Sequence, residues 1–586
     1  MGLIFIARLF YLQIVESKYK TSANDNALRY LTTYPARGLI YDRAGKLLVY
    51  NEATYDLMVT PKELDPQMDT AAFCALTGIE KDVLIKKLKA SRQYSGFIPS
   101  VIDEKIPPEL YGVLQEKLAA FPGFFIQART IRNYTQPIAA HMLGYIGEIT
   151  PEQLEQDDYY RPGDYIGISG LERSYEKELR GKKGVRIIMV DVNGQEKGSY
   201  LQGRMDVQAM AGADLYTSIE TDLQAYGEKL MKNKRGSVVV MEPETGEVLA
   251  IVTSPNYDPG LLAGRERAKN YFELLSDKEL PLFNRALNGK YPPGSTFKTA
   301  VGLVGQYEGV LSPGTRYPCY GGFPLGNGKK VGCHAHGGPL DLKGAIQHSC
   351  NAYFCKVFKT CIDNKSFENP HEALTEWRRL MQKLALGRRT GIDLPNESSG
   401  NIPSAEYYDK MWGKGKWRAL SIISLGIGQG EILLTPLQMA NLTCIIANRG
   451  TYYAPHIVRA IGDPDHKNPK YLEKIETGFN PRYFDAIIQG MYYVVVSGTA
   501  ANVKIDDIAV CGKTGTAQNA GKNHSIFIAF APMQHPKIVV AAVVENSGAG
   551  AEWAAPIASL IIEHYLTGDT KRKDMEAGII NSKASE

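Results

Sequence analysis

Several features are scarce or missing in this 586-residue chain, and each excludes a class of protein. The formal net charge is only +4, from 67 basic and 63 acidic residues, and there is no basic stripe or nucleic-acid-binding motif. Nucleic acid is therefore not expected as a partner. The signature of disorder is also missing, because apolar residues make up 44% of the chain. The length prior for such a globular chain is about two to four domains.

The N-terminus lacks a hydrophobic run long enough to cross a membrane. Its apolar stretch, residues 3–15, is shorter than the ~20 residues that a membrane-spanning helix needs, and Arg8 interrupts it. It also lacks the small-residue cleavage site of a signal peptide. From the residues alone, a partial membrane anchor over residues 1–17 and an amphipathic or packed first helix both stay open.

The string Ser295-Thr-Phe-Lys298 offers a nucleophile and its base. Residues three apart share a helix face, so Ser295 and Lys298 can meet if the stretch is helical. The preceding Tyr291-Pro-Pro-Gly294 is typical of a turn before a helix that begins at Ser295, where the helix dipole would favour an oxyanion. Lys298 can accept a proton only when neutral, which burial or a nearby cation would bring about. Alone, such a short match is more often an ordinary helix start.

The string Lys513-Thr-Gly-Thr516 offers a cation that could lie near Lys298, and it lies in a region with strand-forming segments. The apolar segments on either side of it predict two adjacent strands joined by a polar turn. Lys513 is expected to hold a substrate carboxylate, helped by the hydroxyls of Thr514 and Thr516. Gly515 would let an extended substrate approach and pair with the strand. The amides of Thr516 and Ser295 would form an oxyanion hole, and the plain alternative is a hairpin with turn residues.

The string Ser349-Cys-Asn351 follows a segment, 340–347, that is expected to be helical. Ser349 could relay a proton to the leaving amine, and Asn351 could hold the lysine or the substrate amide. Taken alone, a serine and an asparagine near a helix end are more often caps. The order and separation of all three strings argue against coincidence and indicate serine acyl transfer with a lysine base.

With these motifs in this order, the chain resembles the class B penicillin-binding proteins, which are peptidoglycan D,D-transpeptidases, and above all their elongation type, penicillin-binding protein 2. The resemblance covers nearly the whole chain. It also rests on Arg37-Gly-Leu-Ile-Tyr-Asp42-Arg43, Gly163-Asp-Tyr-Ile-Gly-Ile-Ser-Gly170-Leu-Glu172, Glu242-Pro-Glu-Thr-Gly246, Ser254-Pro-Asn-Tyr-Asp258, Leu425-Gly-Ile-Gly-Gln-Gly430 and Thr435-Pro-Leu-Gln438. The resemblance implies that Ser295 is the acylated serine. The site would be completed by Lys298, Ser349, Asn351, Lys513, Thr514, Gly515 and Thr516.

The implied fold is α+β in two parts. An elongated N-terminal α+β pedestal of the dimerisation type is expected over residues 18–215, with a small lobe from helix-like stretches near 69–92 and 107–121. A transpeptidase domain is expected over 216–566, with an antiparallel sheet flanked by helices and an all-helical subdomain. The polar tail, 567–586, is expected to be disordered.

The resemblance also implies substrates, partners and location. Peptidoglycan stem peptides would be cross-linked through an acyl-enzyme during cell-wall elongation, and β-lactam antibiotics would acylate the same serine. A SEDS-type glycosyltransferase and rod-complex scaffold proteins would be partners. The family carries one N-terminal transmembrane anchor, and residues 1–17 resemble its outer half. We therefore expect a single-pass bacterial inner-membrane protein with its catalytic domain in the periplasm and no cofactor for catalysis.

Four metal-ligand residues precede or enter the Ser-Cys-Asn motif within one glycine-rich segment. Cys319, Cys333, His336 and Cys350 form a Cys₃His set, which suits a structural tetrahedral zinc. His336 is preferred to His334 because a two-residue spacer after Cys333 lets both ligands face one ion. A disulfide such as Cys319–Cys333, or free thiols, stays open because spacing alone cannot fix connectivity.

Two other functions stay open. One is a D,D-carboxypeptidase or a β-lactamase-type hydrolase, although the Glu-x-x-Leu-Asn string of class A β-lactamases is missing between Asn351 and Lys513. A free β-lactamase also has no use for the large N-terminal domain. The other is a β-lactam-binding scaffold for a glycan polymerase, a role that is compatible with catalysis.

Overall fold

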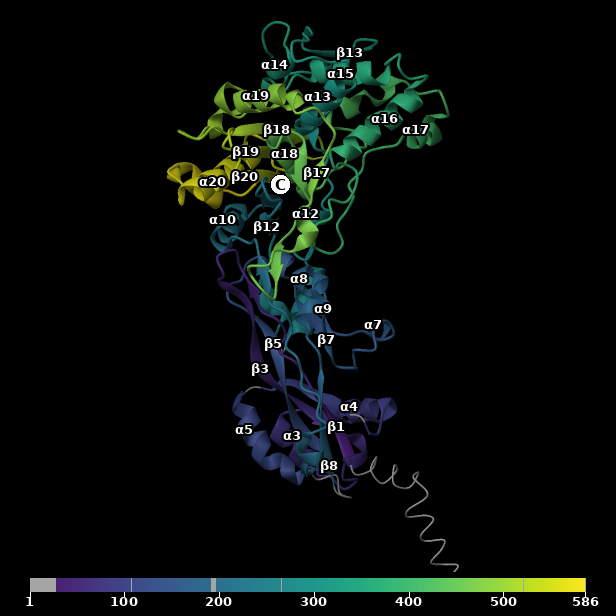
Figure 1. Cartoon of the computed structure of the whole chain (residues 1–586), viewed down its shortest axis with the longest axis vertical. Helices are drawn as coiled ribbons and strands as arrows, with labels where there is room; N and C mark the ends of the chain where they lie inside the picture. Colours follow the sequence, from purple (N-terminus) through teal and green to yellow (C-terminus); the bar gives the residue numbers. More distant parts are fainter. Residues whose placement is uncertain are drawn as a thin grey trace, which may run out of the picture.

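The computed structural model describes residues 28–97, 99–106, 108–190, 196–264, 266–519 and 521–584. It is an elongated molecule, in which a slender pedestal carries a broad catalytic domain at one end (Figure 1). The expected partial anchor, residues 1–17, lies outside the described residues. Within the described ranges, none of the helices has both the length and the apolar character that a membrane span requires.

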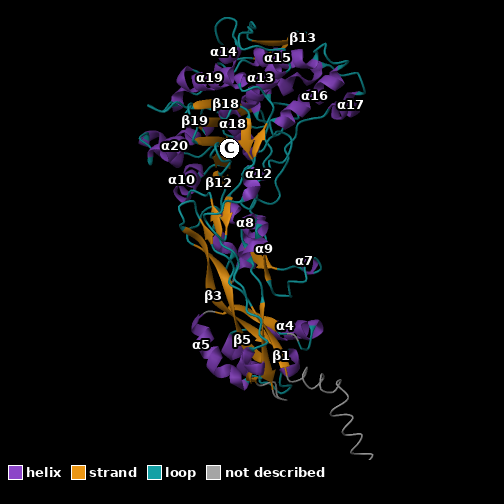
Figure 2. Cartoon of the chain, viewed as in Figure 1, coloured by secondary structure: helices purple, strands orange, loops and turns teal. Residues whose placement is uncertain are grey.

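The pedestal is built on one long antiparallel strand pair. Strand β3 (Leu47–Val59) pairs with β5 (Phe124–Tyr134) from Val49 opposite Tyr134 to Val59 opposite Phe124. At one end, short helices close over this pair around the fully buried Phe73 and form the predicted small lobe (Figure 2). The remaining pedestal strands are β1 (Leu28–Thr33), β2 (Ile40–Tyr41), β4 (Ser100–Ile106), β6 (Ile146–Glu148), β7 (Tyr165–Gly167), β8 (Gly184–Val190) and β9 (Glu196–Ser199). Its helices are α3 (Thr70–Thr77), α4 (Lys81–Tyr94), α5 (Pro108–Lys117), α6 (Ala140–Leu143), α7 (Pro151–Leu154), α8 (Gly170–Ser174) and α9 (Glu176–Leu179).

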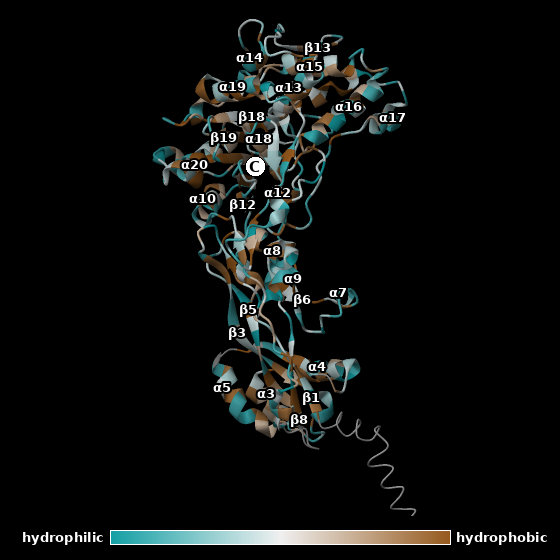
Figure 3. Cartoon of the chain, in the orientation of Figure 1, coloured by the Kyte–Doolittle hydropathy of each residue, from teal (hydrophilic) through white to brown (hydrophobic). Residues whose placement is uncertain are grey.

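The catalytic domain is organised by a five-stranded antiparallel sheet in the order β12-β11-β20-β19-β18. Every residue of β11, β12 and β20 is buried, which agrees with their largely apolar sequences (Figure 3). The strands are β11 (Gly236–Met241), β12 (Val248–Ser254), β18 (Cys511–Ala517), β19 (His524–Ala531) and β20 (Ile538–Val544). The helices α10 (Thr221–Met231) and α20 (Ala554–Thr567) pack on one face and α18 (Pro436–Ala447) on the other. Strand β18 forms the edge of the sheet beside the active site.

A mainly helical subdomain lies beyond the edge strand β18, at the end of the molecule farthest from the pedestal (Figure 1). Its main helices are α13 (Lys298–Tyr307), α14 (Leu342–Gln347), α15 (Asn351–Ile362), α16 (Pro370–Lys383), α17 (Ala405–Trp412) and α19 (Arg482–Ser497). A two-stranded hairpin, β13 (Gly322–Gly326) and β14 (Lys329–Gly332), projects from it. Smaller elements are α11 (Arg267–Ser276), α12 (Arg285–Asn288), β15 (Thr451–Tyr453) and β17 (Lys474–Glu476). The two-part α+β architecture is therefore as predicted.

The two parts share a sheet. Strand β10 (Leu215–Thr217) pairs in parallel with β2 of the pedestal and antiparallel with β16 (Val458–Ile461), which lies far along the catalytic segment. The predicted boundary between residues 215 and 216 thus falls inside a strand. Because backbone hydrogen bonds cross the junction, the pedestal continues into the catalytic domain without a loose linker.

A buried ion-pair network joins two of the motifs noted in the sequence. The carboxylate of Glu172 is fully buried and accepts from Nε of Arg37 and Nε of Arg132, both at 2.6 Å. Arg37 Nη2 also donates to Glu176 Oε2 at 2.6 Å. Burial alone would raise the pKa of Glu172, but the two guanidinium groups hold it below its ordinary value. The network ties the chain at Arg37 to helices α8 and α9.

The prediction of a disordered tail is wrong for its described residues. Residues 573–581 form helix α21 (Lys573–Asn581), whose Ile579 is only 7% exposed. Glu563 of α20 forms an ion pair with Arg572 (Oε2 to Nε, 2.8 Å) just before this helix. The polar composition concealed this helix because a few apolar side chains are enough to pack a short helix against an existing core.

We predict that Glu172→Ala lowers the free energy of unfolding by about 3 kcal/mol, because it leaves the buried guanidinium of Arg132 without its counter-charge and leaves Arg37 with Glu176 alone. Urea unfolding of the purified protein measures this change. Glu155→Ala, which removes an exposed carboxylate from the same region, is the control and should change the value by less than about 0.5 kcal/mol. Equal losses in the two variants would contradict a stabilising role for the network.

Candidate active site

Ser295 lies in a tight turn that is pressed against the edge strand. Residues 294–297 form a 3₁₀ turn, and helix α13 begins only at Lys298, not at Ser295 as predicted. The cause is close packing: Gly294 has φ +55°, and a Cβ there would lie 2.8 Å from the carbonyl oxygen of Thr516. Ser295 is half-buried beside β18. The turn thus places the serine where the sheet edge and the helical subdomain meet.

Lys298 is fully buried behind this turn. Its Nζ donates to the carbonyl oxygen of Ser349 (2.7 Å), to Oγ of Ser349 (3.2 Å) and to Oδ1 of Asn351 (2.6 Å). Among the described residues these bonds reach the Ser-Cys-Asn motif and not Ser295. Burial lowers the pKa of Lys298 to about 8. With this pKa about a tenth of the amine is neutral at pH 7, far more than for an exposed lysine, and this makes it suitable as a general base.

Ser349 lies between two lysines. Its Oγ also accepts from Nζ of Lys513 at 3.0 Å, so the hydroxyl bridges Lys298 and Lys513. Its backbone has φ +54°, a conformation that is uncommon for residues other than glycine. Burial, followed by the charge of Lys298, holds the pKa of Lys513 well below its ordinary value. The hydroxyl therefore connects two amines that are both poised to lose a proton.

The third motif forms the edge strand β18 itself. Lys513 is fully buried under Ser349. Thr516 is the partly exposed side chain of the motif. A Cβ on Gly515 would lie 2.8 Å from the carbonyl oxygen of Pro293, so the close packing of the serine turn against β18 requires this glycine. Because β18 is the sheet edge, pairing with an extended peptide stays compatible with the fold.

Two residues next to the site were not assigned a role from the sequence. Gln429 donates from Nε2 to the carbonyl oxygen of Thr516 at 3.1 Å, which places the glycine-rich turn 425–430 beside the active site. Thr499, just after α19, shares a hydroxyl–hydroxyl hydrogen bond of 2.7 Å with Thr514. The only signal for them in the sequence is the neighbouring glycines, Gly428 and Gly498, where the backbone packs closely against other segments.

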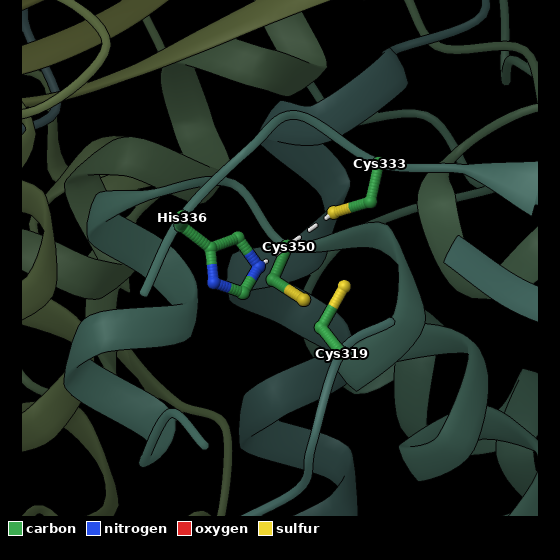
Figure 4. Close-up of side chains that lie close together, drawn as sticks. All are labelled: Cys319, Cys333, His336 and Cys350. Atoms are coloured by element: carbon green, nitrogen blue, oxygen red, sulfur yellow. Dashed lines mark hydrogen bonds between the residues drawn. The ribbon is translucent and has the colours of Figure 1, made fainter. Parts of the chain in front are cut away.

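Cys319, Cys333, His336 and Cys350 come together beside the Ser-Cys-Asn motif, with all four donor atoms within 4.8 Å of one another (Figure 4). The alternate ligand, His334, is exposed and lies outside the group. The backbone amide of Asn351 donates to Sγ of Cys333 at 3.2 Å. All eight cysteines of the chain have free thiols in this structure, so the disulfide alternative is not formed.

Comparison with known proteins decides the family. A family model of the penicillin-binding protein transpeptidase domain matches residues 236–563, and one of the penicillin-binding protein dimerisation domain matches residues 32–217. The chain belongs to the class B penicillin-binding proteins. The family resemblance found in the motifs is thereby confirmed over both parts of the chain.

Relatives of this class B penicillin-binding protein are similar along nearly their full length. Peptidoglycan D,D-transpeptidase MrdA of Haemophilus influenzae is 32% identical, over 96% of this chain and 89% of the relative. The solved complex of penicillin-binding protein 2 with MreC from Helicobacter pylori has a TM-score of 0.77 at 27% identity, covering 92% of this chain and 99% of that one. A peptidoglycan synthase complex, solved to explain how polymerization and crosslinking are coordinated, gives a TM-score of 0.72 at 26% identity, covering 97% and 98%.

The pKa of Lys298 gives a pH prediction for this class B penicillin-binding protein. The neutral amine is the active base, so the rate of serine acylation should rise about tenfold per pH unit below pH 8 and level off above it. Stopped-flow measurement of acylation by a fluorescent penicillin between pH 6 and pH 10 provides the profile. Lys298→Arg, which keeps the charge but cannot deprotonate, should lower the rate by at least about a hundredfold. A flat profile, or near-normal acylation of Lys298→Arg, would exclude Lys298 as the base.

Proposed function

We propose that this protein is a peptidoglycan D,D-transpeptidase that cross-links stem peptides during cell-wall elongation, and that β-lactams acylate its Ser295. The observation that supports this most is the pair of buried lysines, Lys298 and Lys513, joined through the hydroxyl of Ser349. Such an arrangement supplies a base that can be neutral, a hydroxyl that can relay a proton and a second amine in one site.

In the proposed reaction, neutral Lys298 takes the proton of Ser295. Oγ of Ser295 attacks the carbonyl carbon of the peptide bond that joins the two terminal D-alanines. The oxyanion is held by the amides of Ser295 and Thr516. The terminal D-alanine leaves as its nitrogen takes a proton relayed through Ser349. An amine of a neighbouring stem peptide then attacks the acyl-enzyme, and the serine ester is replaced by a new amide.

The proposed nucleophile can be tested by mass spectrometry after incubation with a labelled penicillin. Wild-type protein should gain one adduct, located on the peptide that carries Ser295, because this half-buried serine lies one helical turn before Lys298, whereas Ser349 is buried between the two lysines. Ser295→Ala should gain none, whereas Ser404→Ala, which removes a hydroxyl of a helix N-cap elsewhere in the catalytic domain, should be labelled like wild type. An adduct that survives Ser295→Ala would refute the assignment.

The four clustered donors support a structural zinc as part of the proposal. Three thiols and one imidazole match the donor set of a closed tetrahedral site. Cys319, Cys333, His336 and Cys350 would hold the ion, and its bonds would fasten the β13–β14 hairpin to the catalytic segment. The amide of Asn351, at 3.2 Å from Sγ of Cys333, would stabilise that sulfur as a thiolate.

Metal analysis of the purified protein tests this site. Wild type should contain about one zinc per chain, Cys319→Ser should lose it, and Cys74→Ser, which removes a pedestal thiol outside the cluster, should retain it. Cys319 is chosen because, unlike Cys350, it is not adjacent to a catalytic residue. Wild-type protein that contains no zinc, or a Cys319→Ser variant that retains its zinc in full, would contradict the proposed zinc site.

The proposal extends to partners and place. The solved relatives include a complex with MreC and a peptidoglycan synthase complex, which supports rod-complex scaffold proteins and a SEDS-type glycosyltransferase as partners of this chain. Attachment to the bacterial inner membrane by an N-terminal anchor, with the catalytic domain in the periplasm, is proposed from the family. The elongated pedestal fits this arrangement because it would hold the active site away from the membrane (Figure 1).

A further inference from the structure

One long segment beside the active site carries positive charge only. Between Gly309 and Leu340 the chain contains Arg316, Lys329 and Lys330 but no aspartate or glutamate. Two backbone hydrogen bonds between Tyr317 and Leu340, of 3.1 and 3.2 Å, close the segment into a loop, and the β13–β14 hairpin forms its centre. The loop is therefore a structured element with a basic surface.

The hairpin is joined directly to a catalytic residue. Nδ2 of Asn351 donates to the carbonyl oxygen of Gly332, the last residue of β14, at 2.7 Å. At about 3.3 Å per residue along a strand, Lys330 lies about 7 Å and Lys329 about 10 Å from this anchor point. Those distances are within the reach of a substrate that is bound at the active site.

The outer surface of the hairpin combines cations with an exposed ring. Tyr320 is 88% exposed, and Lys329 and Lys330 are exposed as well. The Lys330 side chain lies beside Gly321, the residue after Tyr320, with Nζ 3.4 Å from the position of a Cβ there. Within the described part of the chain no ion pair neutralises Lys329 or Lys330. Cations of this kind beside a flat aromatic side chain suit an anionic ligand with apolar surface.

We propose that this hairpin binds the acceptor stem peptide, an anionic peptide whose amine completes the cross-link. The inference rests on the proposed transpeptidase function. The donor would be acylated on Ser295 beside β18, so the acceptor must approach from another direction, and the hairpin adjoins the Ser349–Asn351 side. It also lies at the end of the molecule farthest from the pedestal's small lobe (Figure 1).

In the assisted step, the acceptor's amine nitrogen forms a bond to the acyl carbon as the ester bond to Ser295 Oγ breaks. The amine loses one proton, and Oγ regains one. Water performs the same replacement when no acceptor is bound, which gives hydrolysis. The hairpin would act before this step. By binding the anionic acceptor, Lys329, Lys330 and Tyr320 would raise its occupancy beside the acyl-enzyme, so that its amine reacts more often than water does.

The test separates acylation from transfer. A thioester analogue of the donor stem peptide is supplied with an acceptor peptide amine that has free carboxylates, or with the same peptide amidated. In wild type, the ratio of cross-linked to hydrolysed product should be higher with the acidic acceptor. Lys329→Glu/Lys330→Glu should lower that ratio at least about fivefold for the acidic acceptor while the penicillin acylation rate stays unchanged. Tyr320→Ala should lower it for both acceptors.

The matched control is Lys86→Glu/Lys89→Glu, an equal charge change on exposed residues of α4 at the opposite end of the molecule. It should behave like wild type. An unchanged product ratio in the hairpin variant, with normal acylation, would overturn the acceptor proposal and leave the transpeptidase assignment standing. Absence of any penicillin or donor acylation in wild type would instead overturn the proposed function itself.

Discussion

The burial of two lysine amines around one serine hydroxyl is the constraint on which this site depends. Removing an ammonium group from water is costly, and two such groups near each other are costlier still. The protein lowers this cost by giving Lys298 three oxygen acceptors and by favouring loss of a proton from the pair. The result is an amine that can act as a base at a pH where an exposed lysine would be charged.

Three separate elements must converge to produce that burial. Lys298 begins helix α13, Ser349 and Asn351 lie where α14 gives way to α15, and Lys513 comes from the edge strand β18. Glycines permit the close approach, since a Cβ on Gly294 would collide with Thr516. The five-stranded sheet and its covering helices hold β18 in place. The sheet that contains β2, β10 and β16 holds the catalytic domain on its pedestal.

The sequence was most informative where chemistry depends on short spacing. The serine and lysine of the first motif, the Ser-Cys-Asn motif and the Cys₃His set could all be predicted because each constrains local residues, and the choice of His336 over His334 followed from one spacer. What could not be predicted depends on tertiary packing. The burial of Lys513 under Ser349, the reason for Gly515 and the joining of β16 to the pedestal sheet arise from contacts between segments far apart in the chain. Helix α21 was missed because its few apolar residues stabilise a helix only when they pack against the core of the catalytic domain.

The pKa of the Lys298 amine itself is the measurement that tests this account most directly. Lysine labelled with ¹³C at Cε, followed by NMR across a pH titration, reports each amine, and Lys298→Arg assigns the resonance. The account predicts a resonance that titrates near pH 8 and is missing from the variant. Titration of Lys298 near the ordinary lysine value of about 10.4 would contradict it, because the amine would then be a cation throughout the working range of the enzyme.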